Sequence, residues 1–276
     1  MKTSITYSVI TGAGKGLGKA FADELASQQR NLLLISRPFE GLSKSAHQLA
    51  ATYDIEVKYL EIDFLEPSAV DQVLEWLSKY EIDILINNAG IGSAEFFKDA
   101  SLSDLENIIY VNTTVLSLLT RGLLPKLEKH SPGYILNVSS LSACIPIAYK
   151  TVYPATKAFV YSFSRSLAEE LKDHNIKVSV LLPGAIKTNP EIALRIDQQG
   201  WWVKMGLVEP CHIASQSIRC MLRGKKVIIP GKIDKINWLL MKVLPRAFQI
   251  PIVSNAIKHE IERIRHQVQS ALQKRA

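Results

Sequence analysis

The sequence predicts an α/β protein with a doubly wound parallel β-sheet, and two observations lead to this prediction. Short runs rich in Val, Ile and Leu alternate with longer segments whose apolar residues recur at helical spacing. Near the N-terminus, the apolar run from Tyr7 to Ile10 leads into Thr11-Gly-Ala-Gly-Lys-Gly-Leu-Gly18, and a helical pattern follows. Continuous apolar strands that alternate with helices are typical of a parallel sheet covered on both faces.

The expected elements alternate along the chain, and right-handed crossovers between parallel strands give the doubly wound arrangement. The strand candidates are Ile5–Ile10, Asn31–Ser36, Glu56–Glu61, Ile82–Ile86, Tyr134–Val138, Lys177–Leu182 and Lys226–Ile229. The helix candidates are Gly16–Gln29, Phe39–Tyr53, Ala69–Tyr80, Leu102–Lys129, Val152–Lys172 and Pro210–Leu222. No repeat or linker interrupts this pattern, so we interpret residues 1–231 as one domain and 232–276 as a helical, basic and apolar extension.

Several distinctive residues follow predicted strands, at the edge of the sheet where doubly wound proteins bind their ligands. The glycine run 12–18 lies between a strand and a helix, where glycine lets the backbone approach a phosphate at the helix N-terminus. An isolated glycine cluster is equally typical of a flexible loop, but this position favours dinucleotide binding. The other residues after strand ends are Arg37, Asp63, Asn88–Gly90, Ser140 and Pro183–Thr188.

Tyr153 and Lys157 lie four residues apart on a predicted helix, so that both side chains can act on the same small volume. A free tyrosine has a pKa near 10, and a lysine cation within a few ångströms would lower it by roughly 1–3 units. Ser140, thirteen residues before Tyr153, would hold a carbonyl oxygen beside the phenol. These groups are suited to reducing a ketone or oxidising an alcohol.

The composition excludes several classes of protein. The cysteines show no Cys-x-x-Cys spacing and the six histidines are scattered, so we expect free thiols, a cytoplasmic location and no metal site. We see no secretory signal and no apolar run of the roughly 20 residues that span a bilayer. The basic tail contains no nucleic-acid-binding motif. The cysteines are Cys144, Cys211 and Cys220.

Taken together, these motifs resemble those of the short-chain dehydrogenase/reductase family, in its single-domain form, from about residue 4 to residue 231. They occur in the family's order, and they are Thr11-Gly-x-x-x-Gly-x-Gly18, Asp63, Asn87-Asn-Ala-Gly90, Asn112, Ser140, Tyr153-x-x-x-Lys157, and Pro183-Gly184 with Thr188. The resemblance implies a Rossmann fold and an oxidoreductase that uses a nicotinamide cofactor.

The resemblance further implies a catalytic tetrad of Asn112, Ser140, Tyr153 and Lys157. Tyr153 would donate a proton to the carbonyl oxygen while the nicotinamide gives hydride to carbon. Lys157 would tune the phenol and hydrogen-bond the nicotinamide ribose, Ser140 would polarise the oxygen, and Asn112 would anchor a water that relays protons through Lys157. Two alternatives stay open: Asn112 caps a local bend in a long helix, and Ser139 takes the place of Ser140.

Cofactor contacts are implied in the same way. Asp63 would contact the adenine amino group, unless it is a solvated loop acid, and Asn87 would tie neighbouring strands together. The expected cofactor-binding residues are Gly12, Gly14, Lys15, Gly16, Leu17, Gly18, Ser36, Arg37, Asp63, Phe64, Asn88, Ala89, Gly90, Tyr153, Lys157, Pro183, Gly184, Ile186 and Thr188.

The end of the second strand predicts which nicotinamide cofactor is used. NAD-preferring sites place an acid there, which accepts hydrogen bonds from the ribose 2′-hydroxyl. This chain has Ser36 and Arg37 at that point and Lys15 in the glycine loop, which gives two cations and no acid. Arginine can bind a 2′-phosphate in a bidentate manner, so we expect NADP(H). The alternative is that both cations are solvated surface charges.

Apolar residues around the catalytic motif predict an apolar substrate. Cys144, Ile145 and Ile147 would form one wall, and the segment after Thr188 would form a mobile lid. For the tryptophans of that segment, ordinary core packing is the alternative. We expect Thr156, which replaces a common serine, to have no effect. The lid residues are Ile192, Leu194, Ile196, Trp201, Trp202, Met205 and Leu207.

The expected function is therefore an NADP(H)-dependent oxidoreductase acting on a long-chain 3-oxoacyl, steroid-like or aliphatic carbonyl compound or its alcohol. The alternative is a nucleotide-sensing or scaffold protein that has the same fold without turnover. The resemblance implies a homodimer or homotetramer built through the helices Leu102–Lys129 and Val152–Lys172.

The tail differs from the body in charge. Residues 225–276 contain 11 basic and 3 acidic residues, a net charge of +8, which leaves 22 basic and 23 acidic residues, a net of −1, in 1–224. The tail opens with the apolar run Ile236–Leu244, has expected breaks at Pro245 and Pro251, and closes with a helical apolar stripe. The stripe is Ile257, Ile261, Ile264, Val268 and Leu272.

Three interpretations of the tail are open. The stripe packs on the enzyme body or on a second subunit, the apolar run beside basic residues rests on an anionic membrane as a peripheral contact, or the tail docks an acidic acyl carrier.

Overall fold

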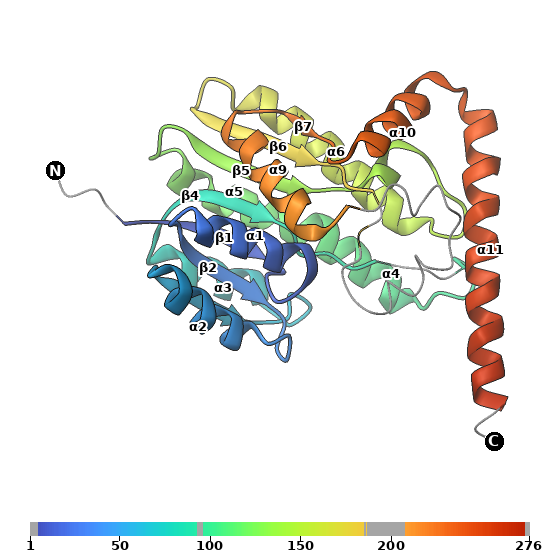
Figure 1. The fold of residues 1–276 in the computed structure, drawn as a ribbon, viewed down its shortest axis with the longest axis horizontal. Helices are drawn as coiled ribbons and strands as arrows, with labels where there is room; N and C mark the ends of the chain where they lie inside the picture. Colours follow the sequence, from blue (N-terminus) through green and yellow to red (C-terminus); the bar gives the residue numbers. More distant parts are fainter. Residues whose placement is uncertain (1–4, 93–95, 185, 187–207, 274–276) are drawn as a thin grey trace.

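A parallel β-sheet forms the centre of the molecule. The computed structural model describes residues 5–92, 96–184, 186 and 208–273, with backbone alone at 256, 259, 260 and 263–273. The sheet has seven strands in the order β3-β2-β1-β4-β5-β6-β7, which confirms the doubly wound prediction (Figure 1). The strand order reverses between β1 and β4, where such folds bind their ligands. The strands are β1 (Thr6–Thr11), β2 (Asn31–Ser36), β3 (Val57–Glu61), β4 (Glu81–Asn87), β5 (Gly133–Val138), β6 (Ile176–Leu181) and β7 (Val227–Ile228).

Helices cover both faces of the sheet, which is why its central strands lack an alternating pattern. In β2 the four residues from Leu32 to Ile35 are all fully buried. One apolar layer joins the sheet to α3, α5 and α6, and the other joins it to α1, α2 and α9. The bounds are α1 (Gly16–Ser27), α2 (Leu42–Tyr53), α3 (Ala69–Ser78), α4 (Leu102–Ile109), α5 (Leu116–Leu127), α6 (Val152–Glu170) and α9 (Pro210–Leu222).

The helix predicted over Leu102–Lys129 contains a π-helical turn, Tyr110–Val115, between α4 and α5. Such turns add a residue to the helix locally and often occur at functional sites, and this one carries Asn112. By length and composition, the stretch Leu102–Leu127 is apolar enough to cross a membrane. Its buried side chains pack in the core against the sheet, however, so it serves as a core helix.

The helix predicted from Phe39 begins three residues later, at Leu42. Phe39 and Gly41 both have positive φ angles, 65° and 73°, which turn the chain sharply before the helix starts. This turn places Glu40 beside the end of β2.

The tail forms two helices, α10 (Lys232–Val243) and α11 (Arg246–Gln273), with the expected break at Pro245. The second expected break was wrong, because Pro251 lies inside α11, where it removes one amide donor from the helix. α11 is attached to the body by a hydrogen bond of 3.0 Å from the amide N of Ala148 to Oγ of Ser254. Figure 1 shows α11 standing along the edge of the molecule beyond α10.

Candidate active site

The glycine loop is held against the end of β4 by a set of short hydrogen bonds. Thr11 Oγ1 accepts hydrogen bonds from the amides of Asn88 and Ala89, each 3.0 Å long. Asn88 Nδ2 donates to the carbonyl oxygens of Thr11 and Gly12 at 3.0 and 3.1 Å. A Cβ on Gly18 would lie 2.0 Å from the carbonyl oxygen of Gly12, so only glycine allows this close packing.

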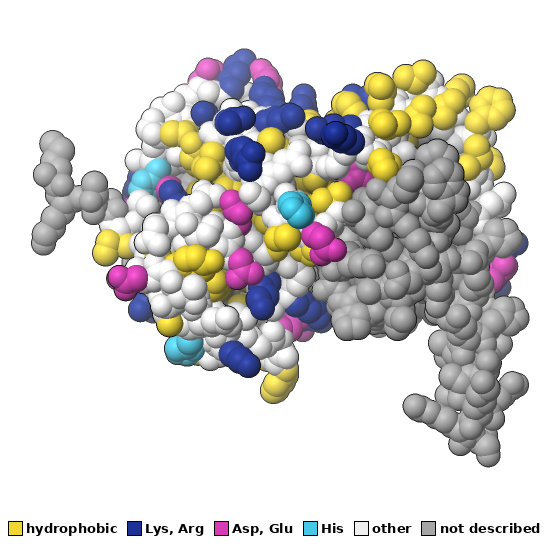
Figure 2. Space-filling view, viewed as in Figure 1, with side chains coloured by type: hydrophobic (Ala, Val, Ile, Leu, Met, Phe, Trp, Pro, Cys, Tyr) yellow, Lys and Arg dark blue, Asp and Glu magenta, His cyan; other side chains and the backbone are white. Residues whose placement is uncertain are grey.

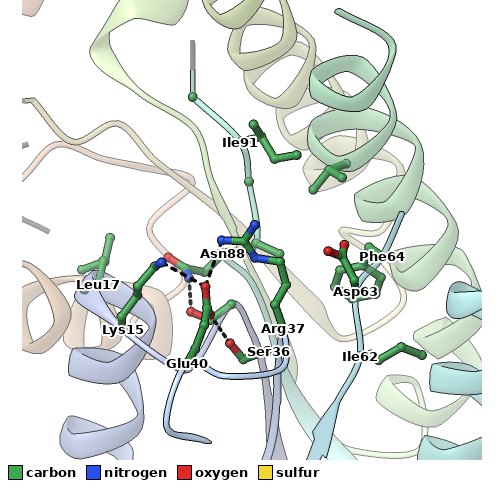
Figure 3. A pocket seen from close by; sticks show the side chains of 16 residues that line it. Lys15, Leu17, Ser36, Arg37, Glu40, Ile62, Asp63, Phe64, Asn88 and Ile91 are labelled. Atoms are coloured by element: carbon green, nitrogen blue, oxygen red, sulfur yellow. Dashed lines mark hydrogen bonds and ion pairs between the residues drawn. The ribbon is translucent and has the colours of Figure 1, made fainter. Parts of the chain in front are cut away.

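A cavity of about 410 Å³ opens beside this loop (Figure 3). Eleven of the expected cofactor-binding residues line it: Gly12, Lys15, Gly16, Leu17, Ser36, Arg37, Asp63, Phe64, Asn88, Ala89 and Gly90. Five further residues that we did not predict complete the lining: Glu40, Ile62, Ile91, Gly92 and Val111. Gly14 lies behind the lining, where a Cβ would be 2.6 Å from Ser36 Oγ.

The shape and chemistry of this cavity fit a dinucleotide. Glycine at 12 and 18 keeps side chains out of the turn, and the loop leads into the N-terminus of α1, where backbone N–H groups favour a phosphate. Lys15 and Glu40 lie on one side of the cavity, and Asp63 lies on the other, as Figure 3 shows. Asp63 Oδ1 accepts a 3.0 Å hydrogen bond from the amide of Leu65, which fixes the carboxylate at the rim.

The prediction of two cations without an acid was wrong. Glu40 Oε1 lies 3.0 Å from Lys15 Nζ and 3.0 Å from Arg37 Nη2, and Glu40 Oε2 accepts a hydrogen bond from Ser36 Oγ. Burial tends to raise the pKa of Glu40, but the hydrogen bonds from Ser36, Lys15 and Arg37 outweigh it and lower that pKa. Lys15 of the glycine loop and Arg37 after β2 are therefore both paired with a carboxylate, although their side chains remain exposed.

Lys157 projects from α6 towards the inner end of the cavity. Its side chain is buried, and Nζ donates a 2.9 Å hydrogen bond to the carbonyl oxygen of Val138. A Cβ on Gly90 would lie 3.3 Å from this Nζ, so the ammonium lies directly behind the cavity lining. Burial lowers the pKa of Lys157 to about 8, which leaves it mostly protonated at neutral pH.

Tyr153 lies one turn earlier on α6, with its ring centroid 5.8 Å from Lys157 Nζ. Burial raises the pKa of Tyr153, and a hydrogen bond with Ser140 acts in the opposite direction. The expected net lowering of this pKa was wrong, because the effect of burial outweighs the opposing hydrogen bond from Ser140. The phenol is consequently protonated at neutral pH and available as a proton donor.

The geometry favours Ser140 over Ser139 as the serine of the site. Ser139 is buried and donates a 2.7 Å hydrogen bond to the carbonyl oxygen of Lys157, so its hydroxyl is used in packing. Ser140 is only half-buried, and its Oγ accepts a 3.1 Å hydrogen bond from the amide of Ser142 while it contacts Tyr153.

Asn112 fastens the loop after β4 to α6. Its Oδ1 accepts from the amide of Ile91 at 2.8 Å, and its Nδ2 donates to the carbonyl oxygen of Ile91 and to Thr156 Oγ1, each at 3.0 Å. Thr156 Oγ1 in turn donates to the carbonyl oxygen of Tyr153 at 2.8 Å. The hydroxyl at 156 thus links Asn112 to the backbone of Tyr153, a role that we did not predict.

A buried amide network supports the ends of β4 and β5. Asn87 Nδ2 donates to Thr120 Oγ1 and Asn137 Oδ1, both at 2.9 Å, and Asn137 Nδ2 donates to Ser164 Oγ at 2.9 Å. Asn87 therefore ties the neighbouring strands together as expected, and the network also connects them to α5 and α6.

The loop after β6 meets α10 instead of the cavity described above. The amide of Gly184 donates a 3.3 Å hydrogen bond to Oδ2 of Asp234, which is buried. Burial raises the pKa of Asp234 to about 6, against the opposing hydrogen bond from Gly184. Pro183 and Ile186 are not among the residues that line the cavity, and Ile186 packs on the core. Thr188, Ile192, Trp201 and Trp202 lie outside the described residues, as does the remainder of the expected lid.

A second cavity, of about 620 Å³, separates the segment after Ser140 from α11. The walls are apolar apart from Thr151 and Arg246, and they are formed by Ala143, Cys144, Ile145, Pro146, Ile147, Ala148, Thr151, Pro154, Ala155, Ala158, Arg246 and Ile250. Burial raises the pKa of the Cys144 thiol, with Lys242 opposing, so this wall stays neutral. Two of the expected substrate residues, Cys144 and Ile145, thus line this cavity.

Glu40, Thr156, Asp234 and Arg246 are polar residues of the site that the sequence interpretation missed. Glu40 could have been noticed as an acid close to Arg37, and Thr156 as a hydroxyl beside Lys157. Asp234 and Arg246 gave no usable signal, because their partners are far away in the sequence.

A serine, a phenol and an ammonium beside a glycine-lined cavity are the groups that the resemblance to dehydrogenases and reductases implies. Residues 7–199 match the family model described as short chain dehydrogenase, and the chain belongs to this family.

Curated relatives and solved structures agree with this classification. The chain is 40% identical over 188 residues to "Very-long-chain 3-oxoacyl-CoA reductase-A" of Danio rerio, covering 66% of this chain and 58% of that one. It is 40% identical over 185 residues to "17-beta-hydroxysteroid dehydrogenase type 3" of Mus musculus, covering 66% of this chain and 60% of the relative. The matches thus span less than two thirds of these relatives. A short-chain dehydrogenase from Sphingobium yanoikuyae in complex with NADPH superimposes with a TM-score of 0.73 at 29% identity, covering 88% of this chain and 97% of that one.

Proposed function

We propose that this protein is an NADP(H)-dependent oxidoreductase that interconverts a carbonyl group and a secondary alcohol on an apolar, lipid-like substrate. The observation that carries the proposal is that Ser140, Tyr153 and Lys157 lie together, with Lys157 directly behind Gly90 of the polar, glycine-lined cavity. Their neighbours in the chain, Cys144, Pro154 and Ala155, line the apolar cavity. The solved relative that binds NADPH and the two curated relatives with acyl or steroid substrates in their names support it.

The side chains divide the chemistry between them. The bound nicotinamide cofactor would supply or accept the hydride. In the reductive direction, Ser140 donates a hydrogen bond to the carbonyl oxygen, and Tyr153 transfers its proton to that oxygen as charge develops there. Lys157 stabilises the resulting phenolate, because its buried ammonium is close to the ring. Asn112 and Thr156 hold the backbone on either side, which fixes the position of the phenol.

The second cavity favours an apolar substrate. Its lining offers few hydrogen-bonding side chains, so a polar molecule would be buried there without hydrogen bonds, at a cost in free energy. A chain of methylene groups does not incur this cost. Arg246 provides a cation at this cavity, which suits a substrate with an anionic end. We therefore infer that the substrate is a long-chain acyl or steroid-like compound whose reacting carbonyl lies near Ser140.

A screen of carbonyl compounds tests the proposed function. The wild-type protein should oxidise NADPH in the presence of ketones that carry long alkyl or ring systems, and slowly with short polar ketones. The Lys157→Ala variant should lose both turnover and affinity for NADPH, because Lys157 contributes to both. Tight NADPH binding without turnover on any carbonyl compound would contradict the proposal and favour a nucleotide sensor.

The outer face of α10 supports a second proposal, that the protein makes a peripheral contact with an anionic membrane. Ile236, Leu239, Leu240 and Val243 recur at helical spacing, and they are exposed by 57, 57, 48 and 73%. Trp238 lies on the other side of the helix and packs on the body, which leaves the exposed stripe without a partner in the described part of the chain. Figure 2 shows hydrophobic side chains gathered over α10 and the start of α11.

The charges around this apolar face match an anionic lipid surface. Four cations, Lys232, Lys235, Lys242 and Arg246, are exposed in the span 232–252, whereas its single acid, Asp234, is buried. An apolar face flanked by cations alone is typical of helices that lie in the membrane interface. On α11, by contrast, Ile261 is buried, which supports the packing alternative for that part of the tail.

Sedimentation with vesicles tests the membrane contact. Full-length protein should bind vesicles that contain phosphatidylserine at low salt and dissociate as the salt concentration rises. A Leu239→Ser and Leu240→Ser double variant should lose most of this binding. A matched double variant, Ile5→Ser and Leu65→Ser, removes exposed apolar side chains elsewhere and should bind as the wild type does. No binding at low salt, or equal losses in both variants, would refute the contact.

Exposed apolar side chains on α4, α5 and α6 support the proposal of a homo-oligomer. Leu102 and Leu118 are exposed by 79 and 46%, and Phe159 by 42%. Burial of such side chains between two copies would gain about 25 cal/mol for each Å² removed from water. Light scattering should give a dimer or tetramer for the wild type and a monomer for Leu118→Lys. A wild-type monomer would contradict this arrangement.

A further inference from the structure

We propose that Glu40 competes with the 2′-phosphate of NADP(H) for Lys15 and Arg37, and so limits the preference of the cavity for a 2′-phosphorylated nucleotide. The inference rests on the proposed function, because it assumes that the cavity of the glycine loop binds the adenosine half of the cofactor.

The contacts of Glu40 are those that a bound anion would make. Its Oε1 lies 3.0 Å from Lys15 Nζ and 3.0 Å from Arg37 Nη2, and Oε2 takes the hydroxyl hydrogen of Ser36. The side chain of Glu40 is only 12% exposed, whereas those of Lys15 and Arg37 are 54 and 55% exposed. Figure 3 shows the carboxylate lying among these three groups at the mouth of the cavity. All the donors expected to recognise a 2′-phosphate are therefore already directed at a carboxylate.

The backbone fixes Glu40 in this place. Positive φ angles at Phe39 and Gly41 turn the loop on both sides of it. On the facing glycine loop, a Cβ on Gly14 would lie 2.7 Å from the Cβ of Glu40, so the two loops are in close contact. The Cβ of Glu40 is thus held against the glycine loop, which keeps the side chain beside the cations.

The charges explain why the carboxylate and the phosphate exclude one another. Lys15, Arg37 and Glu40 together carry a net charge of +1, and a 2′-phosphate adds about −1.5 to −2 at neutral pH. Two anions that share the same cations repel each other. The long, exposed cations can turn from the carboxylate to the phosphate, but Glu40 then loses its partners. A nucleotide with a free 2′-hydroxyl avoids this conflict, because the carboxylate can accept its hydrogen bond.

Nucleotide fragments test this competition without turnover. Isothermal titration calorimetry would measure the affinity of the protein for two fragments. Adenosine 2′,5′-bisphosphate carries the 2′-phosphate, and 5′-AMP does not. We expect Glu40→Gln to bind the bisphosphate about tenfold more tightly, or by about 1.4 kcal/mol, because the side chain keeps its shape and loses its charge. The affinity for 5′-AMP should stay the same or fall. Glu75→Gln, an exposed residue on α3 outside the cavity lining, is the control for the change in net charge and should alter neither affinity.

The outcomes distinguish a failure of the proposed competition from a failure of the proposed cofactor site. If Glu40→Gln weakens the bisphosphate or leaves its affinity unchanged, Glu40 organises the cations for the phosphate and the competition is refuted. If the wild type binds neither fragment, the proposed cofactor site itself is wrong. Glu40→Ala provides a second variant should Glu40→Gln prove unstable, and it should change the two affinities in the same directions.

Discussion

The two cavities of this protein are built in different ways. The nucleotide cavity is formed by short segments that follow the strands β1 to β4. Its loop is fixed by hydrogen bonds that the Thr11 hydroxyl accepts from backbone amides and that the Asn88 side chain donates to backbone carbonyl oxygens. The apolar cavity is formed by the segment after β5, one side of α6 and the distant helix α11. A hydrogen bond between the amide of Ala148 and Oγ of Ser254 joins its two walls.

This difference separates the chemistry from the choice of substrate. In the proposed function, the polar cavity holds the cofactor on a loop fixed by backbone contacts, and small changes there should abolish function. The apolar cavity relies on non-directional packing, so its residues should alter which substrate reacts while the chemistry remains. Substitutions in each region can test this division.

Removal of the phenolic hydroxyl should have the largest effect. Tyr153→Phe should lower kcat by about 10²–10⁴, because the proton donor is lost while the ring remains. NADPH fluorescence titration should give nearly the wild-type dissociation constant. A variant that retains half the wild-type rate would show that another group supplies the proton.

A methyl group on Gly18 should disrupt the nucleotide cavity. The new Cβ would lie 2.0 Å from the carbonyl oxygen of Gly12, so Gly18→Ala should destabilise the fold by about 3 kcal/mol and abolish nucleotide binding. Gly92→Ala is the matched control, because Gly92 lines the same cavity with no atom within 4 Å of an added Cβ. Denaturant unfolding would measure the stability of both variants. Equal losses in the two variants would contradict the close packing of the glycine loop.

The contact between α10 and the loop after β6 should give a pH-dependent stability. Asp234 has a pKa of about 6 in the folded protein, above the value near 3.9 of an unfolded chain. The unfolded chain therefore releases this proton first, and stability falls as the pH rises from about 4 to about 6 and then levels off. Asp234→Asn should remove this fall and stabilise the protein by about 2 kcal/mol at neutral pH, with no gain at about pH 4. Thermal unfolding would measure the stability of the wild type and of Asp234→Asn across this pH range. The account would be contradicted if the stability of the two proteins changed with pH in parallel.

The sequence predicted the polar cavity far better than the apolar one, and the reason is physical. Glycines around a strand end, and Tyr153 four residues before Lys157, act through local backbone geometry that a sequence pattern records directly. Glu40 was missed because a positive-φ turn, and not a regular helix, brings it to Ser36. The tail was only partly predictable, since its apolar residues divide between a buried contact at Ile261 and the exposed face of α10.

The dependence of kcat/KM on substrate chain length tests the division between the two cavities most directly. For a series of straight-chain ketones, kcat/KM should rise by up to about fourfold with each methylene group that becomes buried, or about 0.8 kcal/mol. Ala155→Trp, which narrows the apolar cavity, should end this rise at a shorter chain and leave NADPH binding unchanged. Ser166→Trp, on the same helix but outside the lining, should behave as the wild type does. A flat dependence on chain length, or the same rise in Ala155→Trp as in the wild type, would contradict the assignment of this cavity to the substrate.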